Sequence, residues 1–490
     1  MGSLDVDQSS WKRVAWMLAG VDRRHTAVEH GGECLSMVEG EVHYYEFVLA
    51  EKNFTKLCNT TRMLVVNGSI PGPVIRVHKG DTVYVNVHNQ GYYGVTIHWH
   101  GVKQPRNPWS DDPEYVTQCP IEPGSNFTYE VIFSTEEGTL WWHAHSDWTR
   151  AYVHGAIVIL PAIGTTYPFS KPDDEDIIIL GSLYSGNLKA EYDYDLIYGA
   201  DLPHSIGYTI NGEPGDLCPC SKETTYRRVV DHGKTYLLRL VNSIVAADMF
   251  FAIAEHNLTI VGMDANYIKP ITTSYIMISP GQAMDILLIA NQTLGHYYIA
   301  ARQFWSLGLE VTNFDQVNVT AIIEYRGNYT IPLSPSFPST LPAYKDLLAA
   351  IKFSNLFRSL ASKDHPVNVP LNITTRMNIS GVYTTNFPDQ PLNYYNFIAD
   401  ELPITLANTD LGSKVKVLNY NEAVEVVFQD RHMTWGMAAV FIVKNGGTAE
   451  TSIRKPPPHL PPCNVPLESG VQNNDGPDGK ENQTIFIEMD

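Results

Sequence analysis

Short stretches in which apolar and polar residues alternate recur along the chain, each directly behind a turn. Clear examples are Gly80-Asp-Thr-Val-Tyr-Val-Asn-Val, Gly233-Lys-Thr-Tyr-Leu-Leu-Arg-Leu and Asn421-Glu-Ala-Val-Glu-Val-Val-Phe. Alternation with a period of two places the apolar side chains on one face of a β-strand. Long helical periodicities are few, so we predict an all-β protein. Because the pattern occurs three times at wide spacing, we predict three related β-domains.

The boundaries of these domains follow from apolar strands and changes in composition. We expect a first domain over residues 41–162, a second over 163–327 and a third over 366–468. Residues 1–40 form an atypical N-terminal segment, and residues 469–490 are predicted to be a loose polar tail. A proline-rich linker over 328–365 separates the last two domains. Four apolar positions predict one linker helix on the domain surfaces: Leu347, Leu348, Ile351 and Leu360.

Size and charge narrow the class of protein further. A chain of 490 residues is too long for one ordinary core. The formal net charge of -19 argues against nucleic acid or an anionic membrane as a partner, because both require a basic face. No apolar run reaches the length that crosses a bilayer. We therefore expect no nucleic-acid and no membrane partner.

Glycosylation signals and cysteines indicate the secretory pathway. Eleven sequons begin at Asn53, Asn59, Asn67, Asn126, Asn257, Asn291, Asn318, Asn328, Asn372, Asn378 and Asn482. Six cysteines fit a few disulfides in an oxidising compartment, although buried thiols in a cytosolic protein remain an alternative. The apolar stretch behind Lys12 and Arg13 is short and is followed by Asp22, so it makes a poor signal peptide. The prediction is a secreted, extracellular glycoprotein.

Two His-x-His pairs carry the candidate chemistry: His98-Trp99-His100 and His143-Ala144-His145. Residues two apart on a strand point to the same face, so each pair offers two imidazoles to one site. Imidazoles in this arrangement suit copper, zinc, nickel or iron. Other histidines stand alone and are interpreted as packing or surface residues: His154, His232 and His256.

The stretches around these pairs, Thr96-Ile-His-Trp-His-Gly-Val and Leu140-Trp-Trp-His-Ala-His-Ser-Asp-Trp, resemble the multicopper oxidases, and plant laccases in particular. The resemblance implies three cupredoxin-like Greek-key β-sandwich domains that hold up to four copper ions, one of them a blue copper. It assigns His98 to the type 2 copper of a three-copper cluster. It assigns His100, His143 and His145 to the coupled pair of that cluster.

The same resemblance implies further site residues. It pairs Cys119 with Cys463 and Cys58 with either Cys218 or Cys220. It also gives Asp111 a catalytic role, as an acid near the cluster that helps to deliver protons to reduced oxygen. The family usually has glycine after this acid, whereas this chain has Asp112. In the alternative interpretation, Asp111 only caps a turn.

The third domain departs from the family pattern. The resemblance implies a His-Pro-x-His-x-His motif and a His-Cys-His motif there, and neither occurs in this chain. Strand residues 424–429 run directly into Asp430-Arg-His-Met-Thr-Trp-Gly-Met, where only His432 and the weak axial group Met437 match metal ligands of the family. We therefore expect an incomplete third domain and fewer than four coppers.

These observations lead to one main hypothesis and two alternatives. By resemblance, the chain is a laccase-type oxidase that removes single electrons from phenols such as monolignols and reduces dioxygen to water. It acts as a monomer and, as written, is impaired or inactive because a blue copper requires a thiolate. The first alternative is a non-catalytic, copper-binding secreted glycoprotein from a shortened gene product. The second is an oxidase of ascorbate or a metal ion, as in sister families.

Overall fold

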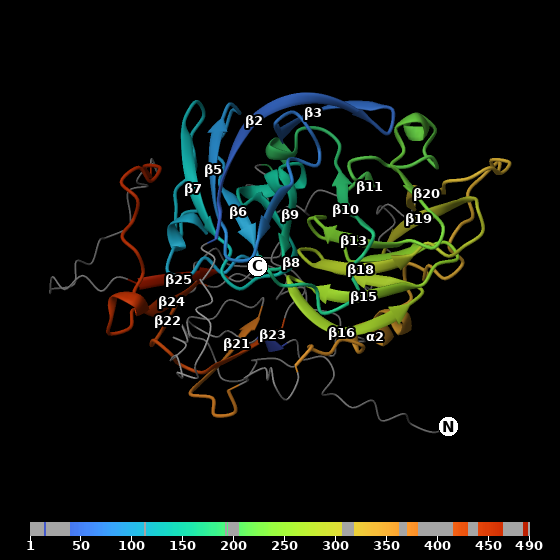
Figure 1. Ribbon diagram of the computed structural model, residues 1–490. Helices are drawn as coiled ribbons and strands as arrows, with labels where there is room; N and C mark the ends of the chain where they lie inside the picture. The colour runs from blue at the N-terminus through green and yellow to red at the C-terminus, as the bar shows by residue number, and fades with distance from the viewer. Residues whose placement is uncertain are drawn as a thin grey trace, which may run out of the picture.

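The computed structural model describes residues 14–15, 40–111, 114–191, 194, 205–305, 318–361, 370–380, 415–429, 440–463 and 484–488. These residues form mostly β-strands with few and short helices (Figure 1), which confirms the predicted all-β class. None of the helices in these ranges is both long and apolar enough to span a membrane.

The first sandwich consists of two four-stranded sheets. One has the order β3-β2-β5-β7, with β3 (Asn59–Val66), β2 (Val42–Lys56), β5 (Thr82–Asn89) and β7 (Asn126–Ile132). The other has the order β4-β9-β8-β6, with β4 (Ile75–His78), β9 (His154–Leu160), β8 (Gly138–Ala144) and β6 (Ile97–His100). Along β5, Val83, Val85 and Val87 are fully buried and their neighbours are partly exposed, as the alternation predicts.

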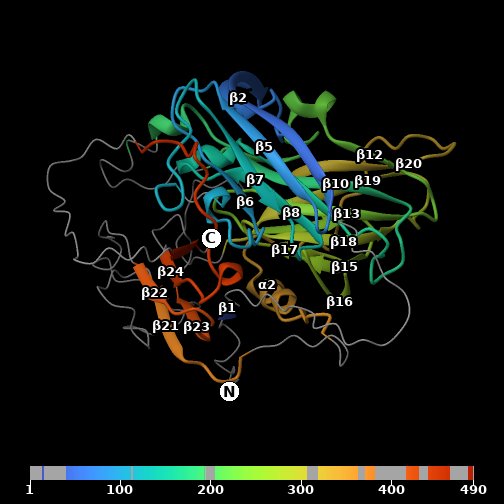
Figure 2. The ribbon, with the colours of Figure 1, turned by 60° about the vertical axis from the view of Figure 1, so that its left-hand side comes forward.

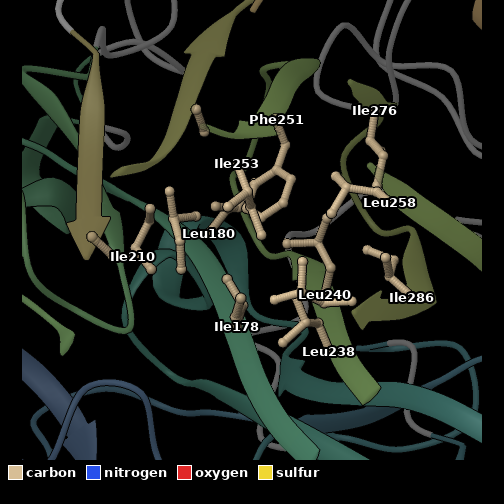
Figure 3. Close-up of a cluster of buried hydrophobic side chains, with 14 of the residues drawn as sticks. Ile178, Leu180, Ile210, Leu238, Leu240, Phe251, Ile253, Leu258, Ile276 and Ile286 are labelled. Atoms are coloured by element: carbon tan, nitrogen blue, oxygen red, sulfur yellow. The ribbon is translucent and has the colours of Figure 1, made fainter. Parts of the chain in front are cut away.

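The second sandwich is larger. Its six-stranded sheet has the order β11-β10-β13-β18-β15-β16, with β11 (Gly207–Ile210), β10 (Asp174–Leu183), β13 (Thr235–Asn242), β18 (Ala283–Ile289), β15 (Leu258–Met263) and β16 (Asn266–Thr273). Its five-stranded sheet has the order β12-β20-β19-β14-β17, with β12 (Arg227–Val230), β20 (Val319–Tyr325), β19 (His296–Gln303), β14 (Met249–Ile253) and β17 (Ile276–Ile278). Leu238, Leu240, Phe251 and Ile286 meet between the sheets (Figure 3).

The two sandwiches are joined by an interface that is partly apolar and partly ionic. Trp141 of β8 packs with Val241 and Ala283 of the second sandwich. Beside them, the fully buried guanidinium of Arg239 forms ion pairs with Asp285 at 3.2 Å and Glu175 at 2.8 Å. Its Nη1 also donates to the hydroxyl of Thr139 on β8. A buried charge is stable only when it is paired and hydrogen-bonded, so this network fixes how the sandwiches meet.

The third region comprises the described residues 370–380, 415–429, 440–463 and 484–488, drawn in orange and red, and the blue strand β1 joins one of its sheets. It lies beside the first sandwich in both ribbon views (Figures 1 and 2). Its described strands form two three-stranded sheets. One has the order β1-β23-β21, with β1 (Val14–Ala15), β23 (Val424–Gln429) and β21 (Thr375–Ser380). The other has the order β22-β24-β25, with β22 (Val415–Leu418), β24 (Val440–Lys444) and β25 (Thr484–Glu488).

The expectation of a loose tail over residues 469–490 is wrong for its last part. The sequence Thr-Ile-Phe-Ile-Glu forms β25, which pairs antiparallel with β24 from Val440↔Glu488 to Lys444↔Thr484. Residues rich in β-branched and aromatic side chains favour a strand, and a sheet edge offers unpaired backbone groups to bind it. The C-terminal strand therefore belongs to the third region.

The predicted linker helix is α2 (Leu347–Ser354). The side chain of Asp346 caps it by accepting a hydrogen bond from the Ala349 backbone at 2.9 Å. Ala350 and Phe353 form its buried face, whereas Leu348 is 79% exposed. Leu360 lies beyond the end of the helix, so the apolar stripe expected from the sequence was only partly right.

The predicted domain limits stay predictions. The strands of the two sandwiches lie within residues 42–160 and 174–325, inside the expected ranges. For the third domain, residues 381–414 and 430–439 lie outside the described residues.

Candidate metal centre

The four histidines of the two His-x-His pairs come from neighbouring strands of the first sandwich. Strands β6 and β8 are antiparallel, and their register places His98 opposite His143. On β6, Ile97 and Trp99 are fully buried in the core, so the two histidines between and beyond them face the other side of the sheet. His145 follows the end of β8, where its backbone amide donates to the carbonyl of Thr96 at 3.1 Å.

The four imidazole rings form a compact group. The ring centroid of His98 lies 5.7 Å from that of His100 and 5.4 Å from those of His143 and His145. The rings of His143 and His145 stack at 5.9 Å. One nitrogen from each of His98, His100 and His143 lies within 4.8 Å of the others. Three donors at this separation can share one ion or bridge two ions.

Hydrogen bonds to backbone carbonyls orient two of these rings. Nδ1 of His98 lies 2.6 Å from the carbonyl oxygen of Asp111, and Nδ1 of His143 lies 2.8 Å from that of Ala144. Because a carbonyl oxygen only accepts, each Nδ1 carries the proton and donates it. In the neutral imidazole, Nε2 is then the unprotonated nitrogen that is able to bind a metal, and the carbonyl partner acts as an outer-sphere support. His100 instead turns its Nδ1 toward Nε2 of His143, at 3.3 Å.

Trp141 of β8 and the backbone of the second sandwich at Gly281 cover one side of the histidine group. Trp141 lies against both His100 and His143, with ring centroids 5.2 and 4.3 Å away. Its indole Nε1 donates to the carbonyl of Gly281 at 2.9 Å. Gly281 has a φ of +83°, and a Cβ there would lie 3.2 Å from Nε2 of His100. A side chain at this position would press on the imidazole, so the backbone conformation and the close approach both favour glycine.

Asp111 reaches the site through its backbone more closely than through its carboxylate. It follows the short helix η2 (Pro108–Ser110), and its amide donates to the carbonyl of Pro108. Its carboxylate Oδ1 lies 3.9 Å from Nδ1 of His98, compared with 2.6 Å for its carbonyl oxygen. The turn-capping geometry and the contact with a predicted copper ligand, His98, thus occur together, and the proton-delivery role stays a prediction.

Sequence reasoning missed the carbonyl of Asp111, the cover by Trp141 and the close approach of Gly281. The Pro-Gly pair at residues 280–281 indicates a turn, but only the fold shows which histidine lies against it. The other two predicted ligands, His432 and Met437, lie outside the described residues.

The three isolated histidines outside the two His-x-His pairs contact other groups. His154 lies opposite His143 across β8 and β9, but it is buried and its Nδ1 donates to the carbonyl of Arg150 at 2.9 Å. Burial lowers its pKa from 6.5 to about 4. His256 is buried between the carbonyl of Ala254 and the hydroxyl of Tyr325. His232 lies 6.3 Å from the ring of Tyr325.

Four cysteines form two disulfides, Cys58–Cys220 and Cys119–Cys463. The pairing of Cys119 agrees with the expectation, and the open choice for Cys58 is decided in favour of Cys220. Cys218 is the one described cysteine outside a disulfide, and it precedes the short helix η4 (Pro219–Thr224) in the second sandwich. Cys463 is therefore unable to serve as a thiolate ligand.

The donor set fits copper. Imidazole is among the preferred ligands of copper, and the unprotonated nitrogens of His98 and His143 are held in place by backbone carbonyls. Zinc and iron accept the same ligands, so the geometry by itself selects a class of metals.

Comparisons with known sequences and structures narrow this class of metals. Models of the multicopper oxidase family match residues 49–163 and 174–328. The chain is 39% identical to "Putative laccase-9" of Oryza sativa subsp. japonica over 582 residues, which covers 91% of this chain and 98% of that protein. It is 36% identical to "Laccase-14" of Arabidopsis thaliana, with coverage of 87% and 95%. The laccase from Botrytis aclada has a similar fold, with a TM-score of 0.59 at 22% identity over 83% of this chain and 72% of that one.

Proposed function

The chain belongs to the multicopper oxidase family, and on that premise we propose a laccase-type copper protein whose first-domain ligand set is intact and whose own oxidase activity is impaired. In this proposal, His98, His100, His143 and His145 hold copper. The proposed substrates are small phenols of the monolignol type together with dioxygen. Bound copper would supply the redox chemistry, taking electrons from the phenol and passing them to oxygen.

One observation carries the copper-binding part of the proposal. Three imidazole donors from two hydrogen-bonded strands lie within 4.8 Å of one another, and two of them are oriented by carbonyls. Ligands on a rigid sheet lose little freedom when a metal binds, so part of the site is preorganised. The protein thereby orients the donors and, through Trp141, limits the access of water to one side of them.

The impairment follows from ligands that the sequence lacks. The 582-residue alignment with the rice protein is longer than this chain of 490 residues, so the relative has residues for which this chain has none. No His-Cys-His motif occurs in the sequence. A blue copper site needs a thiolate beside two imidazoles, and four of the six cysteines are disulfide-bonded. We infer that His432 and Met437 are remnants of that site.

The alternative function is a non-catalytic, copper-binding secreted glycoprotein. The absence of a thiolate motif favours it for this chain, while the intact histidine group is common to both proposals. The two differ in turnover: the alternative predicts copper binding with no phenol oxidation, even at saturating copper.

We propose that the protein is secreted. Two disulfides support an oxidising compartment. Eight sequon asparagines are exposed: Asn53, Asn59, Asn67, Asn126, Asn257, Asn291, Asn328 and Asn372. Protein recovered from the medium of plant cells should lose mass when it is treated with an N-glycosidase. An unchanged mass, or recovery only from the cytosol, would contradict secretion.

The copper assignment is tested by titrating Cu(II) into the metal-free full chain. We expect one or two ions per chain, with nitrogen hyperfine structure from imidazoles in the electron paramagnetic resonance spectrum. His143→Ala removes a central donor, so it should weaken binding by more than the roughly 10–100-fold that loss of an outer-sphere partner costs. His88→Ala is the control, because His88 lies on the partly exposed outer face of β5 and pairs with Glu46. Equal copper binding by both variants would refute the assignment.

A further inference from the structure

A segment near the C-terminus is fastened to the loop that leads into the histidine site. We call residues 449–463 the strap. It begins at the short helix η7 (Ala449–Thr451) and ends at Cys463, which is bonded to Cys119 of the first sandwich. In its first half, at Ser452 and Arg454, the strap runs alongside residues 106–109, which lie far from it in sequence.

Three hydrogen bonds hold the strap to this loop. The indole Nε1 of Trp109 donates to the carbonyl of Arg454 at 2.8 Å. The Arg454 amide donates to the carbonyl of Arg106 at 2.9 Å, and Nε of Arg106 donates to the carbonyl of Ser452 at 2.7 Å. An additional ion pair between Arg454 and Glu130 is partly exposed and contributes little to stability by itself. The bonds to the backbone therefore fix the strap.

The loop is also anchored from its inner side. The side chain of Asn107 is buried and donates to the carbonyl of Glu130 at 2.9 Å. The hydroxyl of buried Ser110 accepts from the Glu130 amide at 3.1 Å, and Gln104 donates to the carbonyl of Ser110. Helix η2 is thus held between the sheet on one side and the strap on the other.

The residue after this helix orients a predicted copper ligand. Asp111 directly follows η2, and its carbonyl accepts the Nδ1 proton of His98 at 2.6 Å. That bond selects the tautomer in which Nε2 is free of a proton and able to bind metal. If η2 were displaced, the carbonyl of Asp111 would move with it. The ring of His98 would then be free to rotate and to adopt the other tautomer.

We propose that Trp109 is a positioning residue, an inference that rests on the proposed copper function. The hydrogen bond from Trp109 to the strap fixes η2. The carbonyl of Asp111, which follows η2, then holds His98 in the orientation that binds copper. The third region thereby contributes to the first-domain ligand set through the strap, although the strap supplies no ligand. Trp109 itself contacts the strap backbone and acts only through Asp111.

The first test needs no metal. In the metal-free full chain labelled with ¹⁵N-histidine, long-range ¹H–¹⁵N spectra should show His98 as the Nδ1–H tautomer. Trp109→Phe keeps the aromatic ring and removes only the indole donor, so we expect the His98 signals to move toward a mixture of tautomers. Tyr298→Phe is the control, because it removes one comparable donor, to Asp216 at 2.9 Å, in the second sandwich. It should leave the His98 signals unchanged.

The second test is Cu(II) titration of the same three proteins. Trp109 lies one step beyond the outer-sphere partner, so Trp109→Phe should weaken binding roughly 3–10-fold, less than the loss of a direct partner. Tyr298→Phe should bind copper like the parent. If Trp109→Phe matches the parent in both tests, the positioning role is overturned while the copper function stands. If the parent binds no copper through His98, the proposed function fails, and the role of Trp109 toward copper fails with it.

Discussion

The full chain loaded with Cu(II) is expected to lack the intense visible band of thiolate-to-copper charge transfer and to consume almost no oxygen with phenols. The band requires a cysteine thiolate on copper. Of the six cysteines, Cys58, Cys119, Cys220 and Cys463 are bonded in disulfides, and Cys218 lies in the second sandwich beside η4. Neither Cys218 nor Cys34, which lies outside the described residues, stands in a His-Cys-His motif. Absorption spectroscopy and an oxygen electrode measure both quantities on one sample.

A restored protein provides the matched comparison. Insertion of the family's third-domain segments, including His-Cys-His between Gln429 and Asp430, should recover both the colour and oxygen consumption. In that protein, His143→Ala should abolish oxygen reduction and leave the blue band in place, because the copper cluster and the blue copper have separate ligands. Stoichiometric blue copper with robust turnover in the chain as written would show that our interpretation of the junction at Asp430 is wrong.

The second prediction with a large expected effect concerns how the free energy of unfolding depends on pH. Burial lowers the pKa of His154 from 6.5 to about 4 and raises the pKa of Asp264 from 3.8 to about 6. The stabilisation linked to neutral His154 is complete above pH 6.5 and is lost as the pH falls toward 4. The stabilisation linked to protonated Asp264 is complete below pH 3.8 and is lost as the pH rises through 6. Each amounts to about 3 kcal/mol, so the two oppose each other between pH 4 and 6.

Single variants should separate these opposing contributions. His154→Asn is chosen to retain a donor for the carbonyl of Arg150, and Asp264→Asn retains an acceptor for the Ala283 amide and tolerates the φ of +48°. Relative to the parent, we expect the free energy of unfolding of His154→Asn to fall by about 3 kcal/mol from pH 4 to 6, and that of Asp264→Asn to rise by about as much. Denaturant titrations at several pH values measure these slopes. Parallel curves for all three proteins would contradict the buried-charge explanation.

The strand pattern could be predicted from the sequence where one face of a strand meets solvent. The alternation after Gly80 corresponds directly to β5, whose valines point into the core. The stretch after Gly233 forms β13, but nearly every one of its residues is buried. One face of β13 packs in the second core, and Val241 on the other face packs against Trp141 of the first sandwich. A contact between domains produces no periodic pattern of apolar residues in the sequence. The burial of both faces of β13 could therefore not be predicted.

The candidate site shows the same limit. The spacing of His98 and His100 was enough to place both on one face, because that placement depends only on strand geometry. The carbonyl of Asp111 and the backbone of Gly281 carry no side-chain signal, and both depend on where a loop folds. The strap lies more than 300 residues from Trp109 along the chain, with a separation of 345 between Trp109 and Arg454. No local pattern connects positions so far apart.

The disulfide between Cys119 and Cys463 joins residues far apart in the sequence, and this separation imposes an order of events during synthesis. Cys119 and its partner Cys463 are separated by 344 residues, whereas Cys58 and Cys220 are separated by 162. At about 5–20 residues per second, roughly 17–70 s pass between the synthesis of Cys119 and that of Cys463. Throughout this interval, the thiol of Cys119 coexists with nearer cysteines, and shorter loops close at a lower entropic cost. Maturation of the native pairs therefore depends on thiol–disulfide exchange, and the redox catalysts of the host cell should limit the yield of folded protein.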